Sequence, residues 1–220
     1  MIRHIVFDLD GTLIDSVPGI EYSARQAVAQ VAPHLLGRVQ GLRARIGPPI
    51  RDILGQLLPE LDAAAVDQVM RAFRASYDSL GWQKSLAFDG VAATLAQLRQ
   101  RGLGLFLVTN KPIGPTRNIL DMLQLHAYFG AVVSPNVQEP PFASKADMVR
   151  HLLIQRQLDP ASGLLVGDAE DDARAAAAAG LRFAAVSYGY GRVWAEPGAH
   201  AVWAVLSDVT ELVALVDGAG

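Results

Sequence analysis

The strongest constraint on the fold is an alternation of apolar strands and amphipathic helices that begins near residue 88 and continues to the end of the chain. Apolar strands separated by helices form parallel sheets that are covered by helices on both faces. The pattern therefore predicts an α/β fold with a doubly wound, Rossmann-like parallel sheet. The expected strands are residues 5–7, 103–108, 131–133, 164–166 and 183–186, and the expected helices are residues 91–101, 115–125, 145–157, 171–179 and 212–216.

The stretch between the first and second strands follows another pattern. Apolar residues recur there at helical spacing over residues 16–31, 50–58 and 62–80, and no strand pattern interrupts them. We therefore expect two domains: a core of residues 1–15 and 88–220, and a helical cap of residues 16–87 inserted directly after the first strand.

Two carboxylates stand one residue apart where the first strand ends. Asp8 and Asp10 would face the same way if the strand continued through them, and Gly11 would then turn the chain away. At ~4 Å and an effective dielectric constant of ~20 their repulsion is roughly 4 kcal/mol. Either one carboxylate is protonated or a divalent metal lies nearby. Aspartates that only cap a helix or form a turn are the alternative.

Other polar residues follow the later strands. Thr109 and Asn110 come after the second strand, Asp168 comes after the fourth, and Lys145 begins the helix before that fourth strand. Because the carboxyl ends of parallel strands meet in one crevice, we expect these groups to converge there with Asp8. Carboxylates with few other ligands suit Mg²⁺, and a hydroxyl, an amide and an ammonium suit phosphoryl oxygens. Taken singly, each residue also fits a polar turn, a helix cap or a solvated surface.

Composition excludes several classes of function. A net charge of −3 provides no basic field for nucleic acid or anionic lipid, so we expect neither as a partner. The absence of cysteine excludes disulfides and thiol catalysis. No apolar run is long enough to span a membrane and the first strand begins almost at once, which leads us to expect a cytoplasmic protein. The chain contains three lysines, Lys84, Lys111 and Lys145.

The motifs around these residues resemble those of the haloacid dehalogenase-like hydrolase superfamily. They are Asp8-Leu9-Asp10-Gly11-Thr12-Leu13, Thr109-Asn110, Lys145, and Gly167-Asp168 followed by Asp172. The resemblance covers essentially the whole chain, since the helical block matches that superfamily's cap. The stretches 46–52, 109–112, 144–146 and Gly189-Tyr190-Gly191 look closest to phosphoglycolate phosphatase-like members.

The resemblance implies a Mg²⁺-dependent phosphatase that hydrolyses a small phosphate monoester. Asp8 would attack phosphorus to form an aspartyl-phosphate, and Asp10 would act as general acid and then as general base. Asp8, the backbone carbonyl of Asp10 and Asp168 would hold Mg²⁺. Thr109, Asn110 and Lys145 would bind the phosphate. Asp172 would support the site through a water or by pairing with Lys145. Loss of Lys145 would cost more activity than loss of Lys111.

Several points stay open at this level. One of Arg43, Arg45 and Arg51, near the Gly47-Pro48-Pro49 turn of the cap, is expected to pair with a substrate carboxylate, with Arg45 and Arg51 preferred. A phosphosugar mutase of the same superfamily, a nucleotidase or a pyrophosphatase are alternative functions. A dehalogenase, a phosphonate-cleaving enzyme, a phospho-receiver module and a binding protein without catalysis are more remote. We expect a monomer or a weak homodimer.

Overall fold

A computed structural model describes residues 1–46, 49–195 and 200–218. The chain divides into two compact units, one of residues 1–15 and 87–220 and the other of residues 16–86. We describe each unit by itself. Gly47 and Pro48, which belong to the turn expected in the cap, lie outside the described residues.

The first unit is built on a parallel sheet with the strand order β5-β4-β1-β6-β7-β8. Every pair of neighbouring strands in it is parallel, which confirms the predicted doubly wound α/β class. The strands are β1 (His4–Phe7), β4 (Gly104–Val108), β5 (Ala131–Val133), β6 (Gly163–Gly167), β7 (Arg182–Val186) and β8 (Ala204–Leu206). A short second sheet pairs β2 (Ile14–Asp15) with β3 (Leu86–Ala87).

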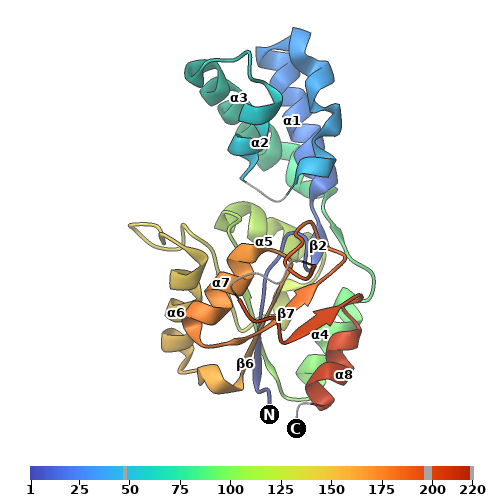
Figure 1. Ribbon diagram of the computed structural model, residues 1–220, viewed down its shortest axis with the longest axis vertical. Helices are drawn as coiled ribbons and strands as arrows, with labels where there is room; N and C mark the ends of the chain where they lie inside the picture. Colours follow the sequence, from blue (N-terminus) through green and yellow to red (C-terminus); the bar gives the residue numbers. More distant parts are fainter. Residues whose placement is uncertain (47–48, 196–199, 219–220) are drawn as a thin grey trace. The chain divides into compact units, whose positions relative to one another are not determined.

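Helices cover both faces of the large sheet, and Figure 1 shows α6 and α7 on one side of it and α4 and α8 on the other. The α6 and α7 face buries a continuous apolar cluster that includes Val6, Phe106 and Leu165 from the strands. The helices of this unit are α4 (Val91–Gln100), α5 (Ile113–Met122), α6 (Lys145–Arg156), α7 (Glu170–Ala179) and α8 (Glu211–Asp217), with short 3-10 turns at His126–Tyr128 and Pro160–Ser162. The core therefore fixes the carboxyl ends of β1, β4, β5 and β6 side by side.

The second unit is helical in its described part. Its α-helices are α1 (Val17–Val31), α2 (Ile50–Leu57) and α3 (Ala63–Ser76), joined by 3-10 segments at Pro33–Gly41, Arg43–Arg45 and Trp82–Lys84 and by a π-turn at Tyr77–Gly81. The predicted apolar stripe of α3 is buried at Val69, Met70 and Phe73, whereas Leu80 is 51% exposed because the α-helix gives way to a π-turn at Tyr77, whose wider turn breaks the 3.6-residue spacing. The Asp62 side chain begins α3 by accepting a hydrogen bond from the Ala65 N–H.

Strand β8 is not predicted by the sequence pattern. This edge strand has three residues and only Leu206 is buried, so it lacks the apolar run that marks the central strands. It pairs in parallel with β7, which extends the sheet by one strand beyond the five predicted.

Candidate active site

The carboxyl ends of neighbouring strands bring three of the predicted site residues to one edge of the sheet. Asp8 follows β1, and its N–H donates to the Val166 carbonyl of β6 at 2.9 Å. Thr109 follows β4, and its N–H donates to the Val133 carbonyl of β5 at 3.1 Å. Asp168 follows β6. Because sheet pairing continues past β1 and β4, the backbone that carries Asp8 and Thr109 is firmly held.

A buried cluster of charged groups forms at this edge. Asp8, Asp168 and Asp172 each offer a carboxylate oxygen, and these oxygens lie within 4.8 Å of one another. Lys145 Nζ lies 2.5 Å from an oxygen of Asp8 and 2.5 Å from an oxygen of Asp172. All four residues are at most 6% exposed. Lys145 is held here because α6 begins at this residue, with Ser144 capping the helix by accepting from the Asp147 N–H.

Burial sets the electrostatics of the cluster. It raises the pKa of Asp8 well above its usual value, with Asp172 and Asp168 adding to the rise and Lys145 opposing it. Burial also raises the pKa of Asp168 to about 6, assisted by Asp172. The Lys145 ammonium has a raised pKa because its two carboxylate partners outweigh the cost of burying it. Lys145 therefore stays protonated while the carboxylates repel one another.

This donor set fits a divalent cation. Counting the described groups of the cluster, three carboxylates surround one ammonium, which leaves an excess of negative charge in a buried place. Oxygen ligands with excess negative charge are the environment that hard divalent cations prefer. The buried aspartate cluster can thus hold a divalent metal.

A loop after β7 holds Asp168 in place. The backbone N–H groups of Tyr190 and Gly191 donate to Asp168 Oδ2 at 2.7 and 3.0 Å. A side chain on Gly189 or Gly191 would overlap Asp168, and one on Gly11, whose φ is +82°, would overlap the Asp168 carboxylate. The glycines therefore let two backbone segments, the turn at Gly11 and the loop after β7, approach Asp168 closely.

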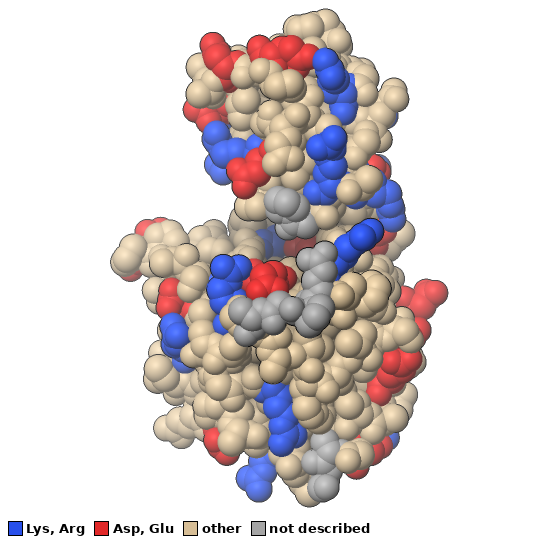
Figure 2. Space-filling view, viewed as in Figure 1, with Lys and Arg blue, Asp and Glu red and all other residues tan. Residues whose placement is uncertain are grey.

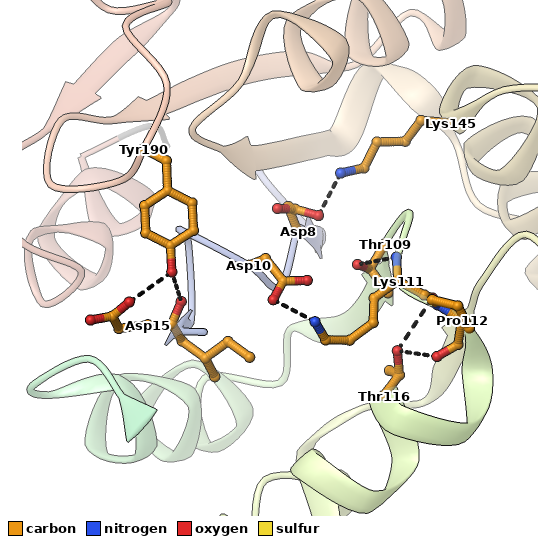
Figure 3. A network of polar contacts seen from close by, with 10 residues as sticks. Asp8, Asp10, Asp15, Thr109, Lys111, Pro112, Thr116, Lys145 and Tyr190 are labelled. Atoms are coloured by element: carbon orange, nitrogen blue, oxygen red, sulfur yellow. Dashed lines mark hydrogen bonds and ion pairs between the residues drawn. The ribbon is translucent and has the colours of Figure 1, made fainter. Parts of the chain in front are cut away.

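The second aspartate of the first motif lies outside the buried cluster. The strand ends at Phe7, so the condition under which Asp8 and Asp10 would face the same way is not met. The Asp10 carboxylate accepts from Lys111 Nζ at 2.8 Å, whereas Asp8 pairs with Lys145 (Figure 3). Each aspartate therefore has its own lysine.

Thr109 and Asn110 have different surroundings. Thr109 is buried, and its Oγ1 accepts a hydrogen bond from the Lys111 backbone N–H at 3.1 Å. Because that oxygen accepts from the backbone, the hydroxyl proton is available for donation. Asn110 is exposed, and its side-chain amide donates to Asp171 at 2.9 Å. The Asn110 side chain thus supports the start of α7.

The two arginines singled out in the cap belong to the helical unit. Arg51 forms an ion pair with Asp67 of α3 at 2.5 Å, and the pairing lowers the pKa of Asp67. Arg45 is exposed at the end of the 3-10 segment Arg43–Arg45. The guanidinium of Arg51 is therefore engaged within its own unit.

Two groups that contact site residues received no role from the sequence. The sequence gives Lys111 less weight than Lys145, although Lys111 is one of three lysines and directly follows Thr109-Asn110. Tyr190 and Gly191 act through backbone N–H groups, which leave no side-chain signature, although the Gly189-Tyr190-Gly191 motif marks the place. The Tyr190 hydroxyl also donates to Asp15 at 2.9 Å.

The family model described as haloacid dehalogenase-like hydrolase matches residues 5–186. The chain belongs to this family. The expected family membership is confirmed. Two characterised relatives are a tyrosine-protein kinase of Mycobacterium tuberculosis, PtkA, 34% identical over 86% of this chain, and a phosphoglycolate phosphatase of Vibrio cholerae, 33% identical over 94% of this chain and 93% of its own length.

Known structures agree with this assignment. A predicted phosphatase from Clostridium acetobutylicum superposes with a TM-score of 0.81 at 25% identity, covering 99% of each chain. The chain spans 63% of the length of the tyrosine-protein kinase, so the match leaves more than a third of that relative uncovered. Across the part of the chain that the structure describes, the helices are too short or too polar to cross a bilayer.

Proposed function

We propose that this protein is a Mg²⁺-dependent phosphatase that hydrolyses a small phosphate monoester, of the phosphoglycolate type, through an aspartyl-phosphate on Asp8. The observation that carries the proposal is the placement of a buried aspartate beside a buried lysine and two further carboxylates at the carboxyl edge of the sheet. Similarity to phosphoglycolate phosphatases along almost the whole chain supports the choice of substrate class.

In the first step the Asp8 carboxylate attacks phosphorus, and the bond from phosphorus to the ester oxygen breaks. Asp10 gives its proton to the departing alkoxide oxygen. Thr109, through its hydroxyl proton, and Lys145 neutralise charge on the phosphoryl oxygens, and the backbone amide of Asn110 supplies a further donor. Asp10 is then ionised and ready to accept a proton.

In the second step Asp10 takes a proton from water as the water oxygen attacks phosphorus. The bond between phosphorus and Asp8 breaks, inorganic phosphate leaves, and both aspartates return to their first state. Asp172 holds Lys145 from behind through their ion pair, which keeps the ammonium beside Asp8.

Asp8, Asp168 and the backbone carbonyl of Asp10 are the groups we assign to Mg²⁺. When bound, the cation offsets the negative charge of nucleophile and substrate and orients the phosphoryl group. On the face drawn in Figure 2, acidic and basic side chains are interspersed within each unit, in keeping with a small substrate held by local groups. The cytoplasmic location and the monomeric or weakly dimeric state stay predictions.

The test is phosphate release from a panel of phosphoglycolate, sugar phosphates, nucleoside monophosphates and pyrophosphate, with Mg²⁺ and with chelator. Asp8→Asn should lower release by about 10⁴-fold or more, because it removes the nucleophile. Asp121→Asn, an exposed aspartate of α5 that pairs with His126, is the matched control and should behave as wild type. The rank order of rates names the substrate class.

Other outcomes would point elsewhere. A phosphosugar mutase would label Asp8 and return the phosphoryl group to the sugar without releasing phosphate. The relative described as a tyrosine-protein kinase makes transfer to tyrosine a second candidate, and it would appear as phosphotyrosine formed from a nucleoside triphosphate. Release that is unaffected by chelator and by Asp8→Asn would overturn the proposal.

A further inference from the structure

Lys111 is built into the active edge almost as firmly as Lys145. Its side chain is 8% exposed, and its Nζ lies 2.8 Å from Asp10 Oδ1, on a carboxylate side chain that is 25% exposed. An ammonium this buried requires an acceptor, and Asp10 Oδ1 supplies one, which leaves the other carboxyl oxygen of Asp10 to carry the proton that is transferred. The pair joins the loop after β4 to the first motif, across 101 residues of sequence.

The loop that carries Lys111 is fixed on both sides of the residue, as Figure 3 shows. Its backbone N–H donates to Thr109 Oγ1 at 3.1 Å, and its carbonyl accepts from Thr116 Oγ1 at 3.4 Å. The Thr116 hydroxyl also contacts the Pro112 carbonyl at 2.9 Å, and Thr116 is fully buried. The point from which the lysine side chain extends is therefore well defined.

Asp10, by contrast, lies where the chain leaves the sheet. It follows Asp8 and Leu9, precedes the left-handed Gly11, and makes an isolated bridge to Ile14. A carboxylate at such a position has several rotamers open to it. The hydrogen bond from a rigidly mounted ammonium selects one of them.

We propose that Lys111 is a positioning residue that holds the Asp10 carboxylate in the orientation needed for proton transfer to the leaving group. The proposal rests on the proposed function, because it needs Asp10 to be the general acid. The two buried lysines then have separate roles, since Lys145 serves the nucleophile and Lys111 serves the proton donor.

This division of roles predicts that the rate lost when Asp10 is misplaced depends on the leaving group of the substrate. When Asp8 attacks an alkyl phosphate, the departing oxygen is strongly basic and needs the Asp10 proton as its bond to phosphorus breaks. When it attacks 4-nitrophenyl phosphate, the departing nitrophenolate is stable without that proton. Misplacing Asp10 should therefore slow the first reaction and leave the second nearly unchanged.

The experiment measures kcat/KM, which reports the steps up to phosphoryl transfer, for 2-phosphoglycolate and for 4-nitrophenyl phosphate. Lys111→Met should lose about 10²-fold with the alkyl ester, the loss expected for a misplaced catalytic group, and only a few-fold with the nitrophenyl ester. Lys111→Arg, which keeps the charge, should recover part of the loss. Lys84→Met, which removes an exposed lysine of the helical unit, is the matched control and should match wild type with both esters.

A second arm tests whether Lys111 acts through Asp10. In an Asp10→Asn background the proton is already missing, so adding Lys111→Met should cause no further loss with the alkyl ester. Thermal unfolding checks that each variant is folded, and Lys111→Gln replaces Lys111→Met if the latter is not.

Equal losses with both esters, or a further loss in the Asp10→Asn background, would show that Lys111 binds the phosphoryl group or the substrate and would overturn the proposal. Unchanged kcat/KM with both esters would overturn it as well. Failure of the proposed function is distinct, because wild type would then release phosphate from neither ester, or Asp8→Asn would release it as fast as wild type.

Discussion

Asp8 and Asp10 are separated by a single residue in the sequence and have very different surroundings. Asp8 is still paired to the sheet and lies in a buried cluster with Lys145 and two more carboxylates. Asp10 lies beyond the end of the strand and is partly exposed. The ion pair described for its carboxylate is with Lys111. The point at which β1 ends therefore gives the two carboxylates different surroundings, one in a buried aspartate cluster that can hold a divalent metal and one near solvent.

The largest expected effect is a difference in the free energy of unfolding between variants of the two lysines. Lys145→Ala leaves three buried carboxylates without their ammonium, which should cost about 3–5 kcal/mol in free energy of unfolding without metal. Lys111→Ala leaves a partly exposed carboxylate that water can solvate, and should cost about 1 kcal/mol. Urea unfolding in the presence of chelator measures both.

Activity should follow the same order. With Mg²⁺ and an alkyl phosphate, Lys145→Ala should lower kcat by about 10³-fold, because it removes a donor to the developing charge and a partner of the nucleophile. The loss with Lys111→Ala should be smaller. Equal losses in stability and in rate would contradict the division between the two pairs.

The next effect is the stabilisation by Mg²⁺, which should depend on the buried cluster around Asp8 and not on the pair of Asp10 with Lys111. At a Mg²⁺ concentration one hundred times the dissociation constant, wild type should gain about 2.7 kcal/mol in free energy of unfolding. Asp168→Asn should lose most of this gain, because Asp168 belongs to the buried cluster beside Asp8. Lys111→Ala, which removes the lysine partner of the Asp10 side chain, should keep it. Stabilisation of Asp168→Asn by Mg²⁺ as large as that of wild type would place the metal elsewhere.

The smallest effect concerns His4, a buried ionisable residue on the strand that leads to Asp8. Burial lowers its pKa from the usual 6.5, partly offset by Asp159, and its ring packs edge to face against Phe106. As pH falls below about 6.5, the unfolded chain binds the proton more readily than the folded chain, so stability is lost.

The measurement is the free energy of unfolding of wild type and His4→Leu from about pH 7 to about pH 5. Wild type should lose more stability over this range than the variant, and the rate of phosphate release per folded molecule should be the same for both. Identical pH dependence of stability would show that His4 does not carry the effect.

Much of this architecture could be predicted from the sequence because the central strands are short apolar runs with sharp ends. Those ends placed Asp8, Thr109 and Asp168 at one edge, where the structure has them. Lys145 could be placed because a capped helix begins there. The edge strand β8 could not be predicted, since it is half exposed and lacks an apolar run.

The finer arrangement depends on contacts that sequence patterns do not encode. Which lysine meets which aspartate is decided by where β1 ends and how the loop after β4 is held by Thr116. The support of Asp168 by Tyr190 and Gly191 uses backbone donors, which nearly any residue offers. Likewise, the pairing of Arg51 with Asp67 follows from the packing of α2 and α3.

The decisive measurement is the identity of the residue that carries phosphate during turnover. The enzyme, mixed with 2-phosphoglycolate and Mg²⁺ and quenched in acid, would be digested, and the phosphoryl group located by mass spectrometry of the peptides. We expect an acid-stable, alkali-labile phosphoryl group on Asp8, present in wild type and missing from Asp8→Asn. A phosphoryl group on a tyrosine, or phosphate release with no phosphorylated peptide and full activity of Asp8→Asn, would contradict the proposed role of Asp8.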